Sequence, residues 1–147
     1  MVQRRYVGQS DMTISKYISD FIEEVTDIKI DTNHVQDGSD KYGLFKSPGR
    51  TIRDFNDGSY EITENYQFMC KQNSASEYDR TDSDEFLENL TYAVDDFPYE
   101  NDYPALDGGR KVKMISLTGC PYPMEADGKE TLYQMSLAIT YLRERTD

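Results

Sequence analysis

The chain has 147 residues, of which 28 are Asp or Glu and only 16 are Lys or Arg, so its formal net charge is −12. This charge repels polyphosphate and disfavours nucleic-acid binding through a basic face. Hydrophobic residues make up 37% of the chain and aromatic residues 12%, which disfavours wholesale disorder, and the length predicts one domain over residues 1–147.

The N-terminal part of the chain predicts a helix and then a short strand. Apolar residues recur at steps of three and four, which places them on one face of a helix over about residues 11–26. Ile28 and Ile30 then alternate with polar residues as in a strand, and the turn-forming residues of 34–40 predict a surface loop. The candidate N-caps of the helix are Ser10, Asp11 and Thr13.

A β-hairpin is predicted in the middle of the chain. Residues 51–55 and 59–71 flank Asn-Asp-Gly at 56–58, where the glycine suits the positive φ of a tight turn. Before the hairpin, a short apolar run at 42–45 precedes Pro-Gly at 48–49, which predicts a turn instead of a continuing strand. The second arm is apolar on one face only, because its apolar residues share one parity: Tyr60, Ile62, Tyr66, Phe68 and Cys70.

The C-terminal half predicts a second helix and two more strands. The helix ends at Pro98, a strand follows over about 110–118, and 119–128 forms a turn-rich loop. Residues 130–142 alternate strictly between apolar and polar, so we predict a strand there despite a high helix propensity. The candidate N-caps of the second helix are Thr81, Asp82 and Ser83.

This element order predicts an α+β fold. Its simplest form is a mostly antiparallel four- to five-stranded sheet, with two amphipathic helices packed on one face.

Histidine and cysteine are scarce, whereas carboxylates are abundant but lack the spacing of a catalytic or metal site. The only two cysteines, Cys70 and Cys120, lack the spacing of a zinc site, and we interpret them as buried thiols and not as a disulfide. The only histidine, His34, lies in a polar segment and is interpreted as an exposed loop residue. The oxygen ligands of 31–40 lack the glycine placement and closing glutamate of an EF-hand. We therefore predict no catalytic residue, no metal and no cofactor, with a carboxylate-based or metal-dependent enzyme as a minor alternative.

No run of the sequence approaches the roughly 18 apolar residues that a membrane span requires. The N-terminal residues are also not followed by an apolar signal-peptide region. We therefore expect synthesis in the cytoplasm and no membrane partner.

Acidic residues are concentrated around the second helix. Ten carboxylates lie between Glu77 and Asp102, where Arg80 is the only base. This pattern fits a solvated helix face, a surface for a basic partner or a lining that keeps DNA from sticking. The candidates for such an acidic channel or partner face are Asp82, Asp84, Glu85, Glu88, Asp95 and Asp96.

Basic residues gather elsewhere in the sequence, and several tyrosines fall in or beside loops. Separate acidic and basic zones allow copies of one chain to dock head to tail, and such contacts close into rings when the rotation permits. Tyrosine suits an interface that is dry inside and wet at its edge, although capping of the core explains it equally well. The candidate interface residues are Arg50, Arg53, Tyr99, Tyr103, Arg110, Lys111, Lys113 and Tyr122.

Five segments together resemble a known family. They are a small first helix, a hairpin leading into Ser-Tyr-Glu-Ile-Thr-Glu-Asn-Tyr-Gln-Phe68, an acidic helix ending at Phe97-Pro98, a Tyr-Pro-Ala-Leu106 segment and a final Thr-Leu-Tyr-Gln-Met-Ser-Leu-Ala-Ile-Thr-Tyr141 strand. The chain resembles the tail terminator proteins of bacteriophages and phage tail-like particles of Gram-positive bacteria, often labelled minor capsid proteins. The resemblance covers residues 10–143 and rests on element order and strand texture. The loop expected over 31–49 matches the family least.

The resemblance implies a structural virion protein and not an enzyme. Such a protein forms a hexameric ring at the tail–neck junction, caps the tail tube, stops its polymerisation and joins it to the neck. The partners implied are further copies of the chain, the tail tube protein, the neck or head-tail connector protein and, in a contractile tail, the sheath protein. Genomic DNA passes through an acidic channel without specific binding, and assembly takes place in the cytoplasm of the bacterial host.

On this interpretation, some acids of the second helix face the channel or a sheath partner. Arg110, Lys111 and Lys113 pair with acids of the adjacent copy. The alternative function is an acidic DNA mimic that inhibits a host nucleic-acid-binding protein.

Overall fold

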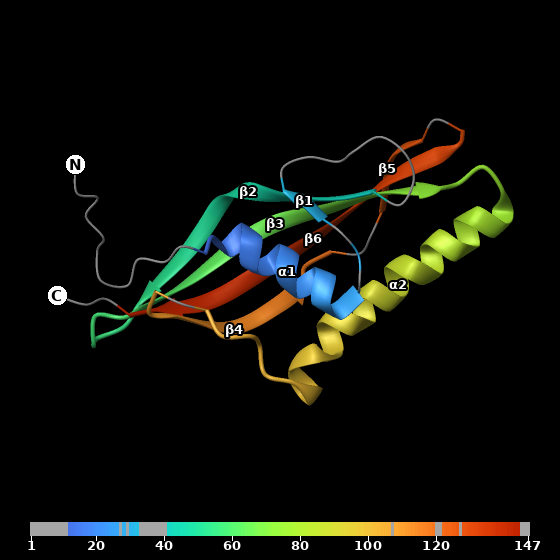
Figure 1. Ribbon diagram of the computed structural model, residues 1–147. Coiled ribbons are helices and arrows are strands. Elements are labelled where there is room, and N and C mark those ends of the chain that lie inside the picture. Colours follow the sequence, from blue (N-terminus) through green and yellow to red (C-terminus); the bar gives the residue numbers. More distant parts are fainter. Residues whose placement is uncertain are drawn as a thin grey trace, which may run out of the picture.

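The protein is an α+β fold in which two helices lie on one face of a long twisted sheet, as the computed structural model shows (Figure 1). The structure describes residues 12–26, 28, 30–32, 41–106, 108–119, 122–126 and 128–144. The elements in chain order are α1 (Ile14–Thr26), β1 (Ile30–Thr32), β2 (Lys41–Asp54), β3 (Tyr60–Asn73), α2 (Glu77–Glu100), β4 (Arg110–Leu117), β5 (Tyr122–Ala126) and β6 (Glu130–Arg143). The predicted fold class is confirmed.

The sheet is built around the pairing of β3 with β6. Five strands follow the order β1-β2-β3-β6-β4, and all neighbours are antiparallel except β1 and β2. The short β5 pairs with β6 as well, along the part of β6 that β4 does not reach. The register of β3 and β6 is unbroken from Tyr60 opposite Arg143 to Asn73 opposite Glu130.

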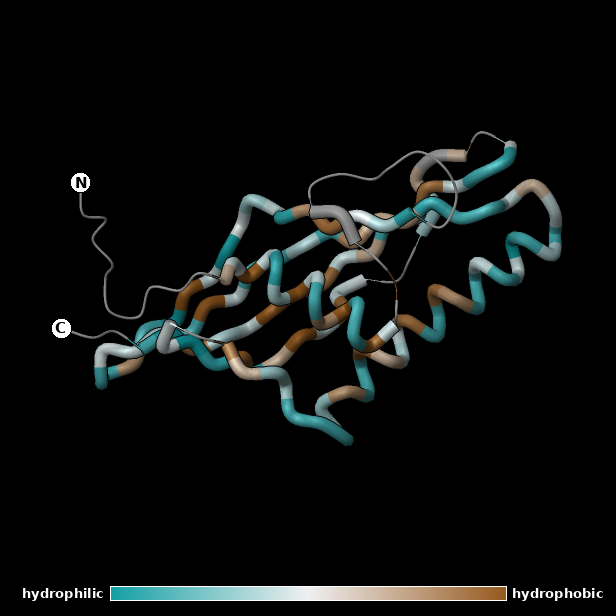
Figure 2. The backbone as a smooth tube through the Cα atoms, viewed as in Figure 1, coloured by the Kyte–Doolittle hydropathy of each residue, from teal (hydrophilic) through white to brown (hydrophobic). Residues whose placement is uncertain are grey.

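The core lies between the sheet and the helices. Alternate residues of β3 and β6 are buried, as their period of two predicted, and brown segments alternate with paler ones along the sheet in Figure 2. Phe21 of α1 connects the two helices. The centre of its ring lies 4.9 Å from the ring centre of Phe97 in α2 and 5.8 Å from that of Tyr103. The buried residues of α1 recur at helical spacing: Ile14, Tyr17, Ile18, Ser19, Phe21 and Ile22.

The first helix and the hairpin agree with their predictions. Thr13 fills the N-cap of α1, where its Oγ1 accepts a hydrogen bond of 3.1 Å from the Lys16 amide. Gly58 has a φ of +90° in the hairpin turn, a conformation that glycine adopts without steric cost. β1 begins at Ile30, and Ile28 precedes it.

The turn predicted at Pro48-Gly49 is wrong, because β2 continues through it. Pairing with β3 shifts register between Lys46 and Arg50, so the strand bulges where the proline lies. β1 pairs only with residues 42–44, and the missing N–H of Pro48 therefore falls where β2 is a sheet edge among the described residues. The loop expected over 31–49 is thus strand from Lys41 onward.

Both predicted ends of the second helix are wrong. Ser76 is the N-cap of α2, since its Oγ accepts a 3.1 Å hydrogen bond from the Asp79 amide. Ser83, a predicted cap, is instead buried within the helix and donates a hydrogen bond to the Asn73 carbonyl. The helix also passes through Pro98 and ends at Glu100, and the packing of Phe97 on Phe21 supports this last turn.

The loop predicted over 119–128 is wrong in part, because it contains the strand β5. Prolines and glycines around this segment favoured turns, but Pro123 lies at an irregularity in the pairing of β5 with β6. An edge strand tolerates proline because its outward N–H groups have no ladder partner. The strands predicted at 110–118 and 130–142 are confirmed as β4 and β6.

The two cysteines and the histidine differ in whether the structure describes them. Cys70 is buried, as predicted, whereas Cys120, His34 and the predicted loop at 34–40 lie outside the described residues. No helix in the described part of the chain is long and apolar enough to span a membrane.

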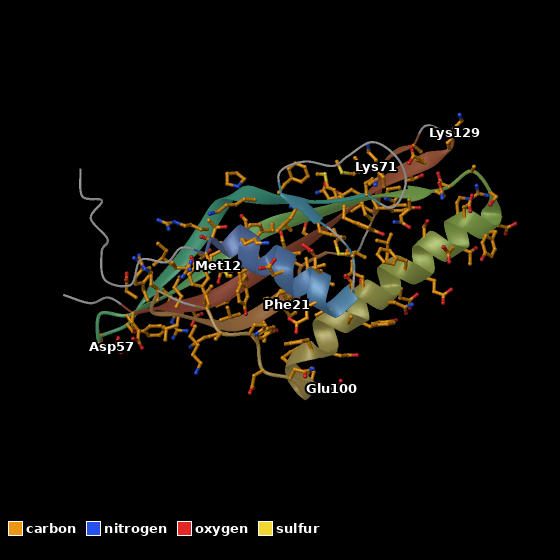
Figure 3. The ribbon with its side chains drawn as sticks, in the orientation of Figure 1. Met12, Phe21, Asp57, Lys71, Glu100 and Lys129 are labelled. Atoms are coloured by element: carbon orange, nitrogen blue, oxygen red, sulfur yellow. The ribbon has the colours of Figure 1, made fainter. Side chains whose placement is uncertain are left out.

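Replacing Phe21 with alanine tests whether one ring holds the helices together. Phe21 is only 1% exposed and contacts rings from α2 and from the segment after it. Figure 3 labels Phe21 on α1. We expect Phe21→Ala to lower the free energy of unfolding by about 3–5 kcal/mol, because it leaves a cavity in the core. Urea unfolding measures this change, with Tyr99→Ala as the exposed aromatic control. Equal stability of the two variants would contradict the prediction.

Candidate interaction surfaces

A basic cluster lies at the hairpin end of the sheet. Cross-strand register places Arg53 opposite Glu61, Glu61 opposite Leu142 and Leu142 opposite Lys111, so bases from β2 and β4 share one row. Arg110, Arg143 and Arg50 lie on the opposite face, because they pair with Arg143, Tyr60 and Glu64 respectively. We use the name basic end for the bases of both faces and define it as Arg50, Arg53, Arg110, Lys111, Lys113 and Arg143. It brings together five of the predicted interface residues.

Three bases of this cluster are engaged within the chain. Arg110 donates a 2.6 Å hydrogen bond to the carbonyl of Met12, which precedes α1. The ammonium of Lys113 lies 3.4 Å from the carboxylate of Glu61. Arg143 donates to the hydroxyl of Tyr60. Arg110, Lys113 and Arg143 therefore already have partners within their own chain.

The other three bases are exposed and make no ion pair with a described residue: Arg50, Arg53 and Lys111. The Arg53 guanidinium lies 5.4 Å from the centre of the Phe55 ring, and the Lys113 ammonium lies 5.8 Å from it. The sequence prediction did not include Phe55, because ring contacts of this kind depend on the turn of the hairpin.

All six acidic candidates lie on exposed positions of α2. The buried side of this helix is the narrow row of Ser83, Leu87, Leu90 and Val94, so most of its circumference faces away from the core. Within the described part of the chain, these six carboxylates form no ion pair. Tyr92 donates a 2.6 Å hydrogen bond to Glu88, and this bond raises the pKa of the tyrosine.

The three candidate tyrosines differ in their surroundings. Tyr99 on α2 is 88% exposed, and Tyr122 on β5 is 48% exposed. Tyr103 is half-buried, and its hydroxyl both accepts a hydrogen bond from the Ile115 amide and donates one to the Ile115 carbonyl. It thereby satisfies backbone groups on the outer edge of β4, while its ring stacks on Phe97.

Two open grooves flank these residues. One of about 820 Å³ runs between β4 and the segment after α2, and it brings together Tyr103, Arg110, Lys111 and Lys113. Another of about 540 Å³ lies between α1 and α2, and we call it the α1–α2 groove. Glu24 and Glu100 line the second groove, and the sequence did not single them out, because only the fold brings the ends of the two helices together.

A buried carboxylate lies on the apolar face of the sheet. Glu64 is 4% exposed and accepts hydrogen bonds from the hydroxyls of Tyr66 at 3.1 Å and Tyr141 at 3.2 Å. The ammonium of Lys46 lies 3.5 Å from the same carboxylate. The parity of β3 placed Glu64 among apolar residues, so the sequence contained a signal that the prediction did not use. The surrounding donors satisfy both carboxylate oxygens, which makes this network a structural element.

No cluster of three or more His, Cys, Asp or Glu side chains that could hold a metal occurs among the described residues. The sequence matches no model of a known protein family. A search of curated proteins likewise finds no match.

Buried tyrosines predict a loss of stability at alkaline pH. Burial raises the pKa of Tyr17 and of Tyr141 to about 12, and Tyr141 also lies beside Glu64. Between about pH 10 and pH 12 the folded chain then binds more protons than the unfolded chain. The free energy contributed by these phenols is thus fully present below about pH 10 and is lost as the pH rises toward 12.

Thermal unfolding across this pH range measures the effect. Tyr17→Phe removes one of the two groups, so we expect its loss of stability with pH to be shallower than that of the natural chain. Tyr99→Phe is the exposed control and should follow the natural chain. Identical slopes for all three proteins would contradict the assignment.

Charge reversal separates the structural bases from the exposed ones. Arg110→Glu removes the hydrogen bond to Met12 and should lower the free energy of unfolding by about 1–3 kcal/mol. Lys111→Glu should change it by no more than about 0.5 kcal/mol, because Lys111 is exposed. Denaturant unfolding of both variants measures this difference. A larger loss for Lys111→Glu would contradict the assignment.

Proposed function

We propose that this protein is a phage tail terminator, a structural protein whose copies form a hexameric ring that caps the tail tube and joins it to the neck. The proposal rests on the segments that resemble this family, from the first helix to the final strand. The function of such a protein requires that the surfaces of neighbouring copies are complementary, and it requires no reactive group. The site of action would be the tail–neck junction of the virion.

The observation that carries the proposal is the separation of charge within one chain. Exposed bases gather at the hairpin end of the sheet, whereas α2 has nine carboxylates and one base. Figure 3 shows that Asp57 at the hairpin and Glu100 at the end of α2 lie far apart on the molecule. A chain with complementary surfaces in different places docks head to tail, and repeated docking with rotation gives a ring.

The edge of the sheet at β2 also has backbone groups that can pair with another chain. β1 pairs only with residues 42–44, so the rest of β2 is a sheet edge within the described structure. Its residues from 48 to 54 are exposed, and Ile52 is 43% exposed. An edge of this kind offers N–H and C=O groups to a neighbouring chain.

The DNA-mimic alternative draws support from the exposed acids of α2, which are also the reason for proposing an acidic channel. A mimic of DNA would carry carboxylates around its whole surface. In this protein the exposed bases of the basic end interrupt such a surface, which favours the tail terminator.

Imaging and light scattering test the proposal. We expect purified protein at low salt to form rings with a central hole and a mass of about six chains. Added in small amounts to polymerising tail tube protein of the same phage, it should stop tube growth and be found at tube ends. A monomer that neither forms rings nor binds tube ends would overturn the proposal, and recovery of host nucleic-acid enzymes in a pull-down would support the DNA mimic instead.

A further inference from the structure

Three tyrosines form a row on the side of α2 that faces away from the core. Tyr78, Tyr92 and Tyr99 follow each other at multiples of seven residues, which correspond to nearly whole helical turns. Val94 is buried only two residues after Tyr92, a rotation of about 200° that places the row opposite the core. The three side chains are 78%, 54% and 88% exposed, and we call them the tyrosine stripe. Capping of the core therefore does not explain them.

An exposed aromatic row of this kind is typical of an interface. An apolar ring with a polar hydroxyl suits a contact that is dry inside and wet at its edge. A second stripe is not a suitable partner, because each α2 has nine carboxylates and one base, and two such helices would repel each other. The stripe therefore requires a surface that is uncharged where the rings lie and basic at its border.

The face of the sheet opposite the two helices is such a surface. In the described part of the chain, both helices lie on the other face (Figure 1). We call this surface the outer face, and four consecutive rows across it contain no charged residue, although 30% of the chain is charged. The rows are Thr51–Thr63–Thr140–Met114, Asn65–Ala138–Ser116, Phe45–Gln67–Ser136 and Gly43–Met69–Gln134–Tyr122.

Polar side chains of the outer face form hydrogen bonds with one another. The side-chain oxygen of Gln67 accepts hydrogen bonds from Gln134 and, at 3.0 Å, from Ser136. The hydroxyls of Thr63 and Thr140 share a hydrogen bond of 3.0 Å. Because these groups already have partners, covering them costs less free energy than covering unpaired polar groups. The outer face is therefore suited to burial under another chain.

Two exposed bases border the uncharged rows at the hairpin end. Arg53 lies opposite Glu61, and Lys111 lies opposite Leu142, in the row next to that of Thr63. Neither base forms an ion pair with a described residue. Both are therefore available to the carboxylates of a partner, and α2 is the most acidic helix of this chain.

The stripe and the outer face also agree in length. From Tyr78 to Tyr99 the stripe extends over 21 residues of helix, which is about 32 Å. From Glu61 to Met69 the outer face extends over eight residues of strand, which is about 27 Å. A helix that lies along the strands therefore places its rings along the whole face.

We infer that the tyrosine stripe of one copy packs along the outer face of the next copy. This inference rests on the proposed function and names the contact by which the copies associate. Each copy offers its stripe to one neighbour and its outer face to the other, so the contact is heterologous and continues around the ring. The first half of α2, with six of its nine carboxylates, is directed to the hairpin end, where Arg53 and Lys111 lie. Exposed acids away from the stripe, such as Asp84, remain available for the channel.

Two double variants test the contact, each disabling one side of it. The stripe variant is Tyr78→Ser with Tyr92→Ser, and the face variant is Lys111→Glu with Met114→Glu, all at exposed positions. We expect each alone to associate at least about tenfold more weakly than the natural chain in sedimentation. The matched controls are Tyr78→Phe with Tyr92→Phe and Lys111→Arg with Met114→Leu. They keep the rings, the charge and the apolar volume, and they should associate as the natural chain does.

Mixing the two disabled variants gives the decisive result. The stripe variant retains an intact outer face and the face variant retains an intact stripe, so one functional contact remains between them. We expect a heterodimer of about twice the monomer mass and nothing larger, because the remaining stripe and face of that dimer are both disabled. Circular dichroism of each variant confirms that it is folded.

The outcomes separate this inference from the proposed function. If the natural chain forms rings and either disabled variant alone forms them equally well, the contact is wrong and the ring stands. If the mixture forms the heterodimer but the natural chain forms open fibres in place of rings, the contact stands and the terminator proposal fails. A mixture that stays monomeric overturns the contact.

Discussion

The pairing of β3 with β6 is the interaction on which the other elements depend. Each strand has 14 residues, and they pair without interruption from Tyr60 opposite Arg143 to Asn73 opposite Glu130. A slip by one residue would turn every apolar side chain of the pair to the solvent face, so the register is strongly specified. β2 pairs along one side of this ladder, and β4 and β5 along the other. The alternate buried residues of the ladder then form the surface on which the two helices pack.

Two contacts between distant segments complete the core. The rings of Phe21, Phe97 and Tyr103 meet where α1, α2 and the following segment converge, and the Tyr103 hydroxyl bonds the outer edge of β4. On the sheet itself, Glu64 is buried among apolar residues and accepts hydrogen bonds from Tyr66 and Tyr141. A buried carboxylate without these donors would be strongly destabilising, so the tyrosines compensate for its loss of hydration.

The charge of the protein is arranged by the same architecture. Because α2 contacts the core through a narrow row, its carboxylates project outward in several directions and the α1–α2 groove forms along one of its sides. The long sheet extends so that the hairpin between β2 and β3 lies away from this helix (Figure 1). Because the opposite charges lie far apart, they do not neutralise each other within one chain and can attract those of another chain. The strength of that attraction depends on the salt concentration.

The sequence by itself determined the elements whose pattern of burial is local. The period of two in β3 and β6, the helical spacing of α1 and the glycine turn at Gly58 each follow from neighbouring residues. It also determined the acidity of α2, because composition alone sets that charge. Tertiary structure decided the rest: the strands through Pro48 and Pro123 depend on edge positions in the sheet, and the last turn of α2 depends on Phe21. Tertiary structure also decided which bases remain available for contacts with other molecules. Lys113 is paired with Glu61 within the chain, and these two residues, which are far apart in the sequence, meet only after folding.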